Sequence, residues 1–328
     1  MDMRKIFFGI AALAAAQIFC AAACAAPEKH LLFLADTPEA MEQNAIINGA
    51  RDALADLNTR YGAEISVFNI TPVSTAANAR INQAQILEEH LKDPLAIGAI
   101  VVADPADARL SAAIKEFEKN KKPVALIRSD LPESGRCFFV GTNAQKVAKC
   151  VLEEVEPHLK KNNFKLLVIH PAAEENLSAA APEKINPAQK ALLESLKGMG
   201  CAQHASSEFF SKFSKKFEGE IEALDNYGVI LLDASPLINS APIKPDSDRN
   251  FIIAMSLRPY LGQYLRSKTI SMCVGDDYFG YGYLSAIAVL QKHFEGKSSN
   301  PDARLLDPIT YKIFQSEEFD KNLNAIFK

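Results

Sequence analysis

Short, uninterrupted apolar runs recur along the chain and alternate with longer amphipathic stretches, and this alternation limits the possible folds more than any other feature. The run Ile97–Val102 (IGAIVV) is apolar throughout, which is typical of a strand in a parallel sheet that is covered on both faces. The stretch Ala40–Leu57 carries apolar residues at helical spacing. Repeated βα units of this kind predict a doubly wound α/β fold.

The remaining elements are placed by the same patterns. Further strands are expected at Leu31–Ala35, Ile65–Phe68, Val124–Ile127, Leu166–Ile169, Ala202–Ala205, Val229–Leu232, Ile252–Met255, Ile270–Val274 and Ile309–Ile313. Further helices are expected at Ala76–Leu91, Ala106–Glu118, Ala144–Leu159, Pro187–Leu196, Phe213–Leu224, Tyr260–Leu265 and Gly282–Phe294. The alternation of strands and helices begins again after Asn143, so the sequence predicts two similar halves. The length of 328 residues is enough for two domains.

Residues 1–25 are predicted to be a signal peptide that is not part of the fold. Arg4 and Lys5 form a positive region, Ile6–Ala23 is apolar, and Ala23-Cys24-Ala25 has the small residues of a cleavage site. One alternative is an uncleaved anchoring helix, because the apolar run is near the lower length limit for spanning a bilayer. Another is a lipid anchor on Cys24, although the leucine usual three residues earlier is missing. We expect an exported, periplasmic protein, cleaved near Ala25.

Cysteines that follow the signal peptide can form disulfides in an oxidising compartment. Cys137 lies near the start of one expected strand, and Cys150 lies well along the helix expected to run back beside that strand. This antiparallel geometry predicts a Cys137–Cys150 disulfide. The alternative is that these two, together with Cys201 and Cys273, are free and buried thiols, and the last two are left unassigned.

Several function classes lack their sequence features. The net charge of −4, without a basic cluster that has interleaved aromatic residues, gives no reason to expect nucleic acid as a partner. No Cys or His spacing indicates a metal site, and no cofactor is expected. The sequence has no G-x-S-x-G, P-loop or G-x-G-x-x-G motif, so we do not expect an enzyme.

The order and spacing of several segments resemble the type I periplasmic solute-binding proteins, the ribose- and galactose-binding group. The matching segments are NAIINGARDAL, IGAIVVADPAD, PVALIRSDLP, FFVGTNAQKVAKCVLE, ISMCVGDDYFGYGYLSAIAVLQKHFEGK and ITYKIFQSEEFDKN. The resemblance implies two doubly wound lobes, joined by three crossovers, with a ligand cleft between them. It assigns residues 26–142 and 276–307 to the first lobe, and residues 143–275 and 308–328 to the second.

The polar residues that the family uses for sugars are replaced here. The aromatic run expected after the first strand is Ala40-Met41-Glu42-Gln43 in this sequence, so the ring stack is absent. Arg128, Ser256 and Asp276 stand where the resemblance implies an Asp, an Asp and a Gln. The family's Asn-Asp pair falls at Asp233-Ala234-Ser235 with its order broken. A sugar ligand therefore does not follow from the resemblance alone.

Ligands of open α/β sheets bind at the carboxyl ends of the strands, and the candidate ligand-binding residues are chosen on that basis. They are Asp36, Asp104, Arg128, Asp130, Asp233, Ser256, Asp276 and Tyr278. Structural alternatives remain open for three of them. Arg128 could pair with Asp130 or Asp36 to hold the tip of the lobe, Asp36 could cap its loop, and Asp104 could cap the following helix.

The leading interpretation is an exported solute-binding protein that delivers a small polar ligand to an ABC-type importer through a membrane permease. Arg128 with Asp36 and Asp276 would place both signs of charge around one cavity, which suits a charged small molecule such as an amino acid better than a sugar. The alternative interpretation is a periplasmic ligand-sensing partner of a membrane sensor kinase or chemoreceptor.

Overall fold

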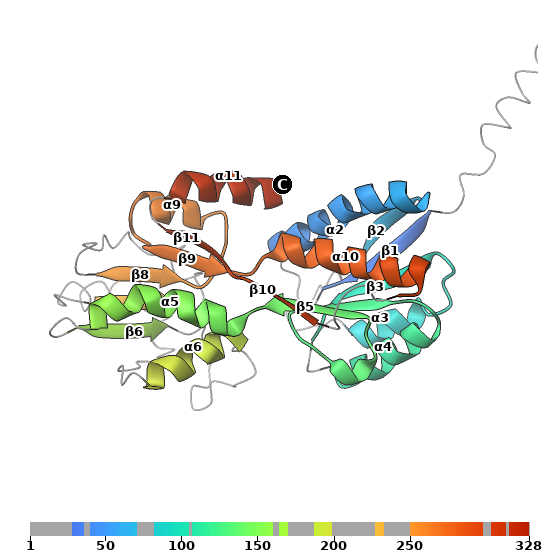
Figure 1. Ribbon diagram of the computed structural model, residues 1–328, viewed down its shortest axis with the longest axis horizontal. Helices are drawn as coiled ribbons and strands as arrows, with labels where there is room; N and C mark the ends of the chain where they lie inside the picture. The colour runs from blue at the N-terminus through green and yellow to red at the C-terminus, as the bar shows by residue number, and fades with distance from the viewer. Residues whose placement is uncertain are drawn as a thin grey trace, which may run out of the picture.

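The computed structural model describes residues 28–35, 40–70, 82–104, 107–159, 164–169, 187–198, 227–232, 250–297, 303–312 and 315–327. Within this part of the chain, the strands form two separate sheets. Figure 1 shows the sheets, with their helices, as two lobes that lie side by side along the longest axis of the molecule. We call the lobe that begins the chain the first lobe and the other the second lobe.

The sheet of the first lobe is parallel throughout, with the strand order β10-β5-β4-β3-β1-β2. Its strands are β1 (Lys29–Leu34), β2 (Ile65–Ile70), β3 (Ala96–Val102), β4 (Val124–Ile127), β5 (Phe138–Thr142) and β10 (Ala303–Leu306). Every residue of β3 is buried, as its uninterrupted apolar sequence requires of a central strand.

Two pairs of helices cover the two faces of this sheet. They are α2 (Ala40–Tyr61) with α10 (Tyr278–Glu295), and α3 (Gln83–Glu89) with α4 (Leu110–Lys119); the short 3-10 turn η1 (Pro132–Ser134) follows β4. Successive side chains of a strand point to opposite faces. Leu31 and Phe33 of β1 therefore pack with α2 and α10, whereas Leu32 and Leu34 pack with α3 and α4.

The sheet of the second lobe has the order β11-β9-β8-β7-β6, with β11 antiparallel to β9 and the other pairs parallel. Its strands are β6 (Lys165–Ile169), β7 (Tyr227–Leu231), β8 (Phe251–Ala254), β9 (Met272–Gly275) and β11 (Ile309–Lys312). Its helices are α5 (Ala144–Leu159), α6 (Pro187–Gly198), α9 (Leu261–Arg266) and α11 (Ser316–Phe327). The first two pack on one face of the sheet and the last two on the other.

The chain passes between the two sheets three times: from β5 to α5, from β9 to α10 and from β10 to β11. The three crossovers are joined by hydrogen bonds. The Asn143 N–H donates to the Leu306 carbonyl at 2.8 Å, and the Thr142 hydroxyl donates to the Asp276 carboxylate at 2.6 Å. The lobes are therefore connected through one hydrogen-bonded group of segments that are far apart in the sequence.

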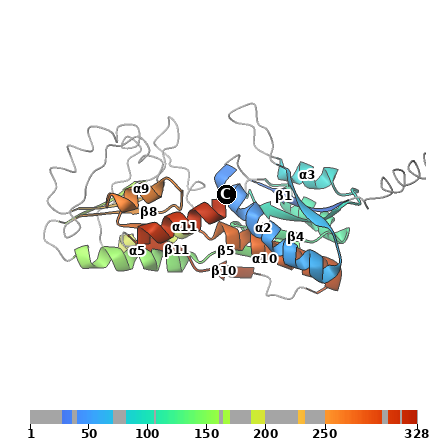
Figure 2. The ribbon, with the colours of Figure 1, turned by 90° about the horizontal axis from the view of Figure 1, so that it is seen from above.

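Helices α2 and α10 lie side by side in both views of the molecule (Figures 1 and 2) and touch at two glycines. A Cβ atom at Gly49 would lie 2.0 Å from the Phe279 carbonyl oxygen, and one at Gly282 would lie 1.8 Å from the Ile46 carbonyl oxygen. Since the obstructing atoms are backbone, neither contact can be relieved by turning a side chain. The close approach of the two helices therefore depends on both glycines.

The mixed α/β architecture with mostly parallel sheets confirms the predicted fold class. Most of the expected strands are present within a few residues of their predicted bounds, but β10 was not predicted. The strand at 202–205 and the helix at 213–224 lie outside the described residues, as do the signal peptide and Cys201. The domain boundaries, residues 26–142 plus 276–307 and 143–275 plus 308–328, stay predictions. None of the described helices is long and apolar enough to cross a membrane.

The predicted disulfide is wrong, because Cys137 and Cys150 are both free thiols. Cys137 is buried in the core of the first lobe, beneath α2 and α10. Helix α5 does not run back beside β5; it follows a crossover, and its buried face packs in the second lobe. The half-buried Cys150 on that helix is therefore held in a different lobe from Cys137. Cys273 is also free, and burial raises the pKa of its thiol.

A half-buried carboxyl group in the first lobe should make the stability of the protein depend on pH. Burial raises the pKa of Glu118 to about 7, while the Val124 N–H donates to its Oε1 at 2.7 Å. The unfolded chain releases this proton near the ordinary pKa of a glutamate, so between about pH 4.5 and 7 the folded protein binds more protons and stability falls as pH rises.

We expect Glu118→Gln to raise the free energy of unfolding at pH 8 by about 1 kcal/mol, a value already reduced for the partial exposure of this side chain. At pH 4 the two proteins should unfold alike. The measurement is urea unfolding at both pH values, with Glu116→Gln on the exposed side of α4 as the control. An equal loss of stability with pH in wild type and Glu118→Gln would contradict the prediction.

Candidate functional site

A small cavity lies between the two lobes, at the carboxyl end of the first sheet. Its lining residues come from the ends of β4 and β5, from both ends of the second crossover and from the start of α6, and they are Arg128, Thr142, Pro187, Ala188, Asp276 and Tyr281. The cavity volume is about 40 Å³, which is room for about three water molecules. A positively and a negatively charged side chain thus face one small space.

Arg128 holds its position through an unusual backbone conformation. Its φ is +69°, its N–H donates to the Val140 carbonyl at 3.0 Å, and the Ser129 N–H donates back to the Ile127 carbonyl at 2.9 Å. This is a tight three-residue turn with a bulky residue at its centre, a conformation that costs roughly 1–3 kcal/mol. Among the described residues, the other non-glycine positions with positive φ are exposed lysines just after helix ends, Lys121 and Lys268. Strain at a cleft residue is typical of functional sites.

Asp276 is fixed by hydroxyl groups of the first lobe. The Thr142 hydroxyl donates to Asp276 Oδ1 at 2.6 Å, and the Tyr281 hydroxyl is hydrogen-bonded to the same Thr142 oxygen. The Tyr281 hydroxyl is also hydrogen-bonded to the Asp276 carboxylate. Burial and the Asp276 carboxylate raise the pKa of Tyr281 far above its ordinary value, so this hydroxyl keeps its proton. The result is a carboxylate whose orientation is set before any ligand arrives.

A second group of charged residues bridges the lobes next to this cavity. Glu42 in the first turn of α2 forms an ion pair with Arg258, which follows β8 in the second lobe, at 2.9 Å between Oε1 and Nη2. The side chains are only 15% and 23% exposed. The Tyr278 hydroxyl, at the start of α10, is hydrogen-bonded to Glu42, and its ring packs edge-on against Tyr281 with centroids 6.0 Å apart.

Two of the eight predicted ligand-binding residues, Arg128 and Asp276, line one cavity, and Tyr278 lies beside it. Ser256 is half-buried at the end of β8. Asp130 is exposed and is bound by Arg136, whose Nη2 lies 2.8 Å from Oδ2.

Asp104, Asp36 and Asp233 complete the predicted set. Asp104 follows β3; its backbone N–H donates to Gln83 Oε1 at 3.0 Å, and its carbonyl accepts from the Asp107 N–H. Asp36 and Asp233 lie outside the described residues. Their roles in ligand binding therefore stay predictions.

Sequence reasoning missed four residues that shape the cleft. Glu42 was noted only as a replacement for an aromatic residue, and no local pattern singled out Arg258. Gln83 is fully buried, and its amide donates to the carbonyls that end β1 and β3, those of Ala35 and Val102, at 2.8 and 2.7 Å. Gln189 does the same for the Leu232 carbonyl in the second lobe at 2.8 Å. Gln189 stands near the start of the helix predicted at Pro187–Leu196, and that position is the signal that could have revealed it, whereas Gln83 falls inside the helix predicted at Ala76–Leu91.

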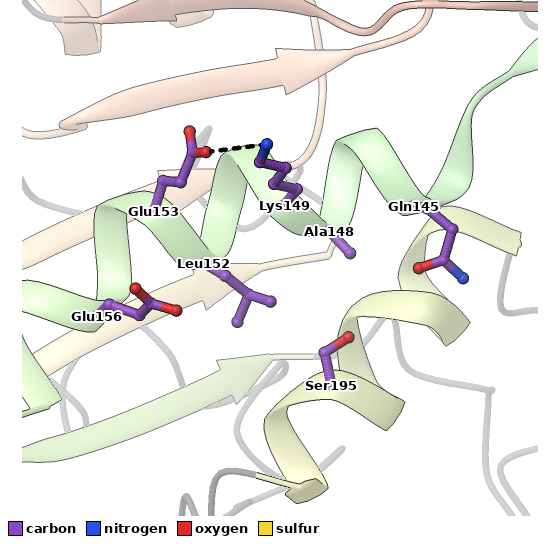
Figure 3. Close-up of a pocket in the computed structure, with 7 residues that line it drawn as sticks. All are labelled: Gln145, Ala148, Lys149, Leu152, Glu153, Glu156 and Ser195. Carbon is purple, nitrogen blue, oxygen red and sulfur yellow. Dashed lines mark ion pairs between the residues drawn. The ribbon is translucent and has the colours of Figure 1, made fainter.

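A larger hollow of about 340 Å³ lies outside the cleft, between α5 and α6 (Figure 3). It is lined by Gln145, Ala148, Lys149, Leu152, Glu153, Glu156 and Ser195. Its one cation, Lys149, is paired with Glu153 at 3.8 Å on the same helix, and both side chains are well exposed. These residues lie on the surface of one lobe, so the hollow does not bring the two lobes together as the small cavity does.

Comparisons with known proteins agree with this architecture. A sequence profile described as periplasmic binding protein domain matches residues 42–298. No curated protein matches the sequence.

Solved structures of sugar-binding transport proteins have a similar fold. A periplasmic ribose ABC transporter protein from Conexibacter woesei is 13% identical, with a TM-score of 0.66 over 92% of this chain and 98% of that one. A carbohydrate transporter protein from Acidothermus cellulolyticus, solved with myo-inositol, is also 13% identical, with a TM-score of 0.64 over 92% and 100%. A glucose-galactose binding protein from Geobacillus stearothermophilus is 16% identical, with a TM-score of 0.60 over 88% and 99%. At sequence identities this low, the likeness to these structures shows the fold alone.

Proposed function

The chain belongs to the periplasmic binding protein domain family, and from that membership we propose that it is an exported solute-binding protein, which captures a small polar ligand between its two lobes and delivers it to an ABC-type importer. Members of this family are solute-binding proteins that work in the periplasm or outside the cytoplasm, and this supports the reading of residues 1–25 as a signal peptide.

One observation carries the proposal: polar and charged side chains from the first lobe meet the start of α6 from the second lobe around a single cavity, next to the crossovers. Thr142 and Asp276 belong both to the cavity and to crossover segments. A ligand that touched both lobes would favour the closed arrangement over the open one, because it gains contacts only when the lobes meet.

The test is ligand binding by the mature chain. Protein purified from its own cells is denatured, and the released small molecules are identified by mass spectrometry. The refolded protein is then titrated with each of them. At one hundred times Kd, a true ligand adds about 2.7 kcal/mol to the stability, which raises Tm by several degrees. The radius of gyration from X-ray scattering should fall on binding.

Transport is tested separately, by uptake of the identified ligand in cells with and without the gene. Loss of uptake supports delivery to an importer. If no molecule co-purifies and no solute in a broad panel raises Tm, the proposed function is wrong. Binding without any effect on uptake would contradict delivery and leave the binding part standing.

A further inference from the structure

We propose that the Glu42–Arg258 ion pair closes the lobes over an empty cleft and thereby competes with the ligand. We call this pair the latch. The inference rests on the proposed function and concerns how the same cleft is regulated. A solute enters only while the latch is broken, so the latch should lower the apparent affinity of the protein for any solute that binds between the lobes.

Both partners of the latch are held in place by their own lobe. Glu42, in the first turn of α2, is hydrogen-bonded to the Tyr278 hydroxyl of α10. The Arg258 carbonyl accepts from the Leu261 N–H at 2.9 Å, and the neighbouring Leu257 is buried in the core of the second lobe. Residues held in this way lose less conformational entropy on pairing than two free surface side chains do. This partly buried pair should therefore contribute more than an ordinary surface ion pair.

The protein itself compensates the charges of the cleft. Arg128 and Asp276, which are of opposite sign, line the same small cavity, and the latch pairs two further charges beside it. The Asp276 carboxylate also accepts a hydrogen bond from the Thr142 hydroxyl at 2.6 Å. Two positive and two negative groups leave this part of the cleft without net charge, so the closed form does not need a ligand to neutralise it.

The closed form leaves no room for a sugar-sized solute in this cavity. Its volume of about 40 Å³ accommodates about three water molecules, and a pentose is several times larger. The second lobe contributes Pro187 and Ala188, at the start of α6, to the lining. A larger solute can bind between them and Arg128 only if the lobes move apart. Since Arg258 moves with α6 as part of the second lobe, this movement breaks its 2.9 Å contact with Glu42.

A second contact between the lobes needs no ligand either. Helix α11 is held in the second lobe by the fully buried Phe319 and by a hydrogen bond from the Asn322 amide to the Tyr311 hydroxyl at 3.1 Å. It also contacts α2, the helix of the first lobe that carries Glu42, and Figure 2 shows its end beside the start of α2. Two independent contacts therefore favour closure of an empty cleft.

The size of the effect depends on the fraction of ligand-free molecules that are open. The apparent Kd equals the intrinsic Kd divided by the fraction that can bind. We expect the latch to close roughly two thirds of the ligand-free molecules or more, so its removal should raise the affinity about threefold or more. The gain should lie in the association rate constant. The dissociation rate constant should change by less than about twofold, because the latch is already broken in the ligand-bound form.

Neutral substitutions on each side of the latch test the inference. The probes are D-ribose, D-galactose, myo-inositol and any co-purified solute, and binding is measured by calorimetric titration and by stopped-flow tyrosine fluorescence. Glu42→Gln and Arg258→Met should each raise the affinity for a solute that binds wild type by about threefold or more. The double variant Glu42→Arg with Arg258→Glu restores the pair and should return the affinity to within about twofold of wild type.

The matched control is an ion pair inside the first lobe. Arg109 pairs with Glu88 at 2.6 Å between Nη2 and Oε2, and both side chains are exposed. Glu88→Gln and Arg109→Met remove this pair by the same substitutions and should leave every affinity unchanged, since both residues move with one lobe. Circular dichroism verifies that each variant is folded.

The outcomes separate the inference from the proposed function. Unchanged or lower affinity in either Glu42→Gln or Arg258→Met overturns the inference and leaves the proposed function standing. A gain that lies only in the dissociation rate constant does the same. If no probe binds wild type or either latch variant and no solute co-purifies, both are overturned, because the open cleft of those variants should bind a solute most readily.

Discussion

Gly282→Val should lower the free energy of unfolding by about 3 kcal/mol, the largest stability effect that we expect from a single substitution in the first lobe. The valine Cβ would start 1.8 Å from the Ile46 carbonyl oxygen and 3.0 Å from the Ala50 nitrogen. Both are backbone atoms of α2, so the helices must move apart, and the apolar contacts that both make with the sheet loosen with them.

Gly282→Ala tests whether a small side chain at this position raises or lowers the free energy of unfolding. Helix propensity alone predicts that alanine in the second turn of α10 stabilises the protein by about 1 kcal/mol. The contact with α2 predicts the opposite, a loss of about 1–3 kcal/mol. Urea unfolding measures both variants against Asp52→Ala on the exposed side of α2. If Gly282→Ala proves more stable than wild type, the two helices do not pack as described.

Reversing the charge of Glu42 should open the lobes, and reversing Arg258 as well should close them again. Removal of one partner from a fully buried ion pair costs about 3–5 kcal/mol, and exposed pairs contribute about 0.2–1 kcal/mol. The Glu42 and Arg258 side chains are 15% and 23% exposed, so the contribution of this pair should fall between those two values. We expect Glu42→Arg to shift the balance toward the open form by about 1–3 kcal/mol, which is about 5- to 150-fold in population.

X-ray scattering of the ligand-free protein measures this shift as an increase in the radius of gyration. The matched double variant, Glu42→Arg with Arg258→Glu, restores the opposite charges across the cleft and should return the radius close to that of wild type. Arg266→Glu, whose Arg pairs with Asp320 within the second lobe, controls for a general effect of charge. A double variant as open as Glu42→Arg alone would show that the pair does not hold the lobes together.

The sequence predicted the strands well because most of them are buried on both faces, which leaves apolar runs such as VALI in β4. Strand β10 was not predicted, for the converse reason. Its sequence, ARLL, lies at the edge of the sheet with mostly exposed side chains, so nothing in its pattern marks it as a strand. Its pairing with β5 exists only because the last crossover brings the chain back.

The site was predicted less completely because its key contacts join distant residues. Arg128 and Asp276 could be chosen because each follows a strand, and strand ends converge at one edge of a sheet. The Glu42–Arg258 pair joins opposite lobes, and no local pattern shows which charges will meet. The error over Cys137 and Cys150 has the same origin, since a helix that follows a strand was assumed to return along it, whereas here it follows a crossover.

The three crossovers have a consequence for how the protein is made. The first lobe is completed by α10 and β10, which end at residues 295 and 306, long after β5 at residue 142. A chain released from the ribosome only as far as β5 lacks the helix that, with α2, covers Leu31, Phe33 and Ile100. Its first core therefore stays unfinished until nearly the whole polypeptide has been synthesised. Neither lobe corresponds to a contiguous fragment, and cutting the chain at residue 142 leaves an N-terminal piece that lacks an edge strand and a covering helix of its own sheet.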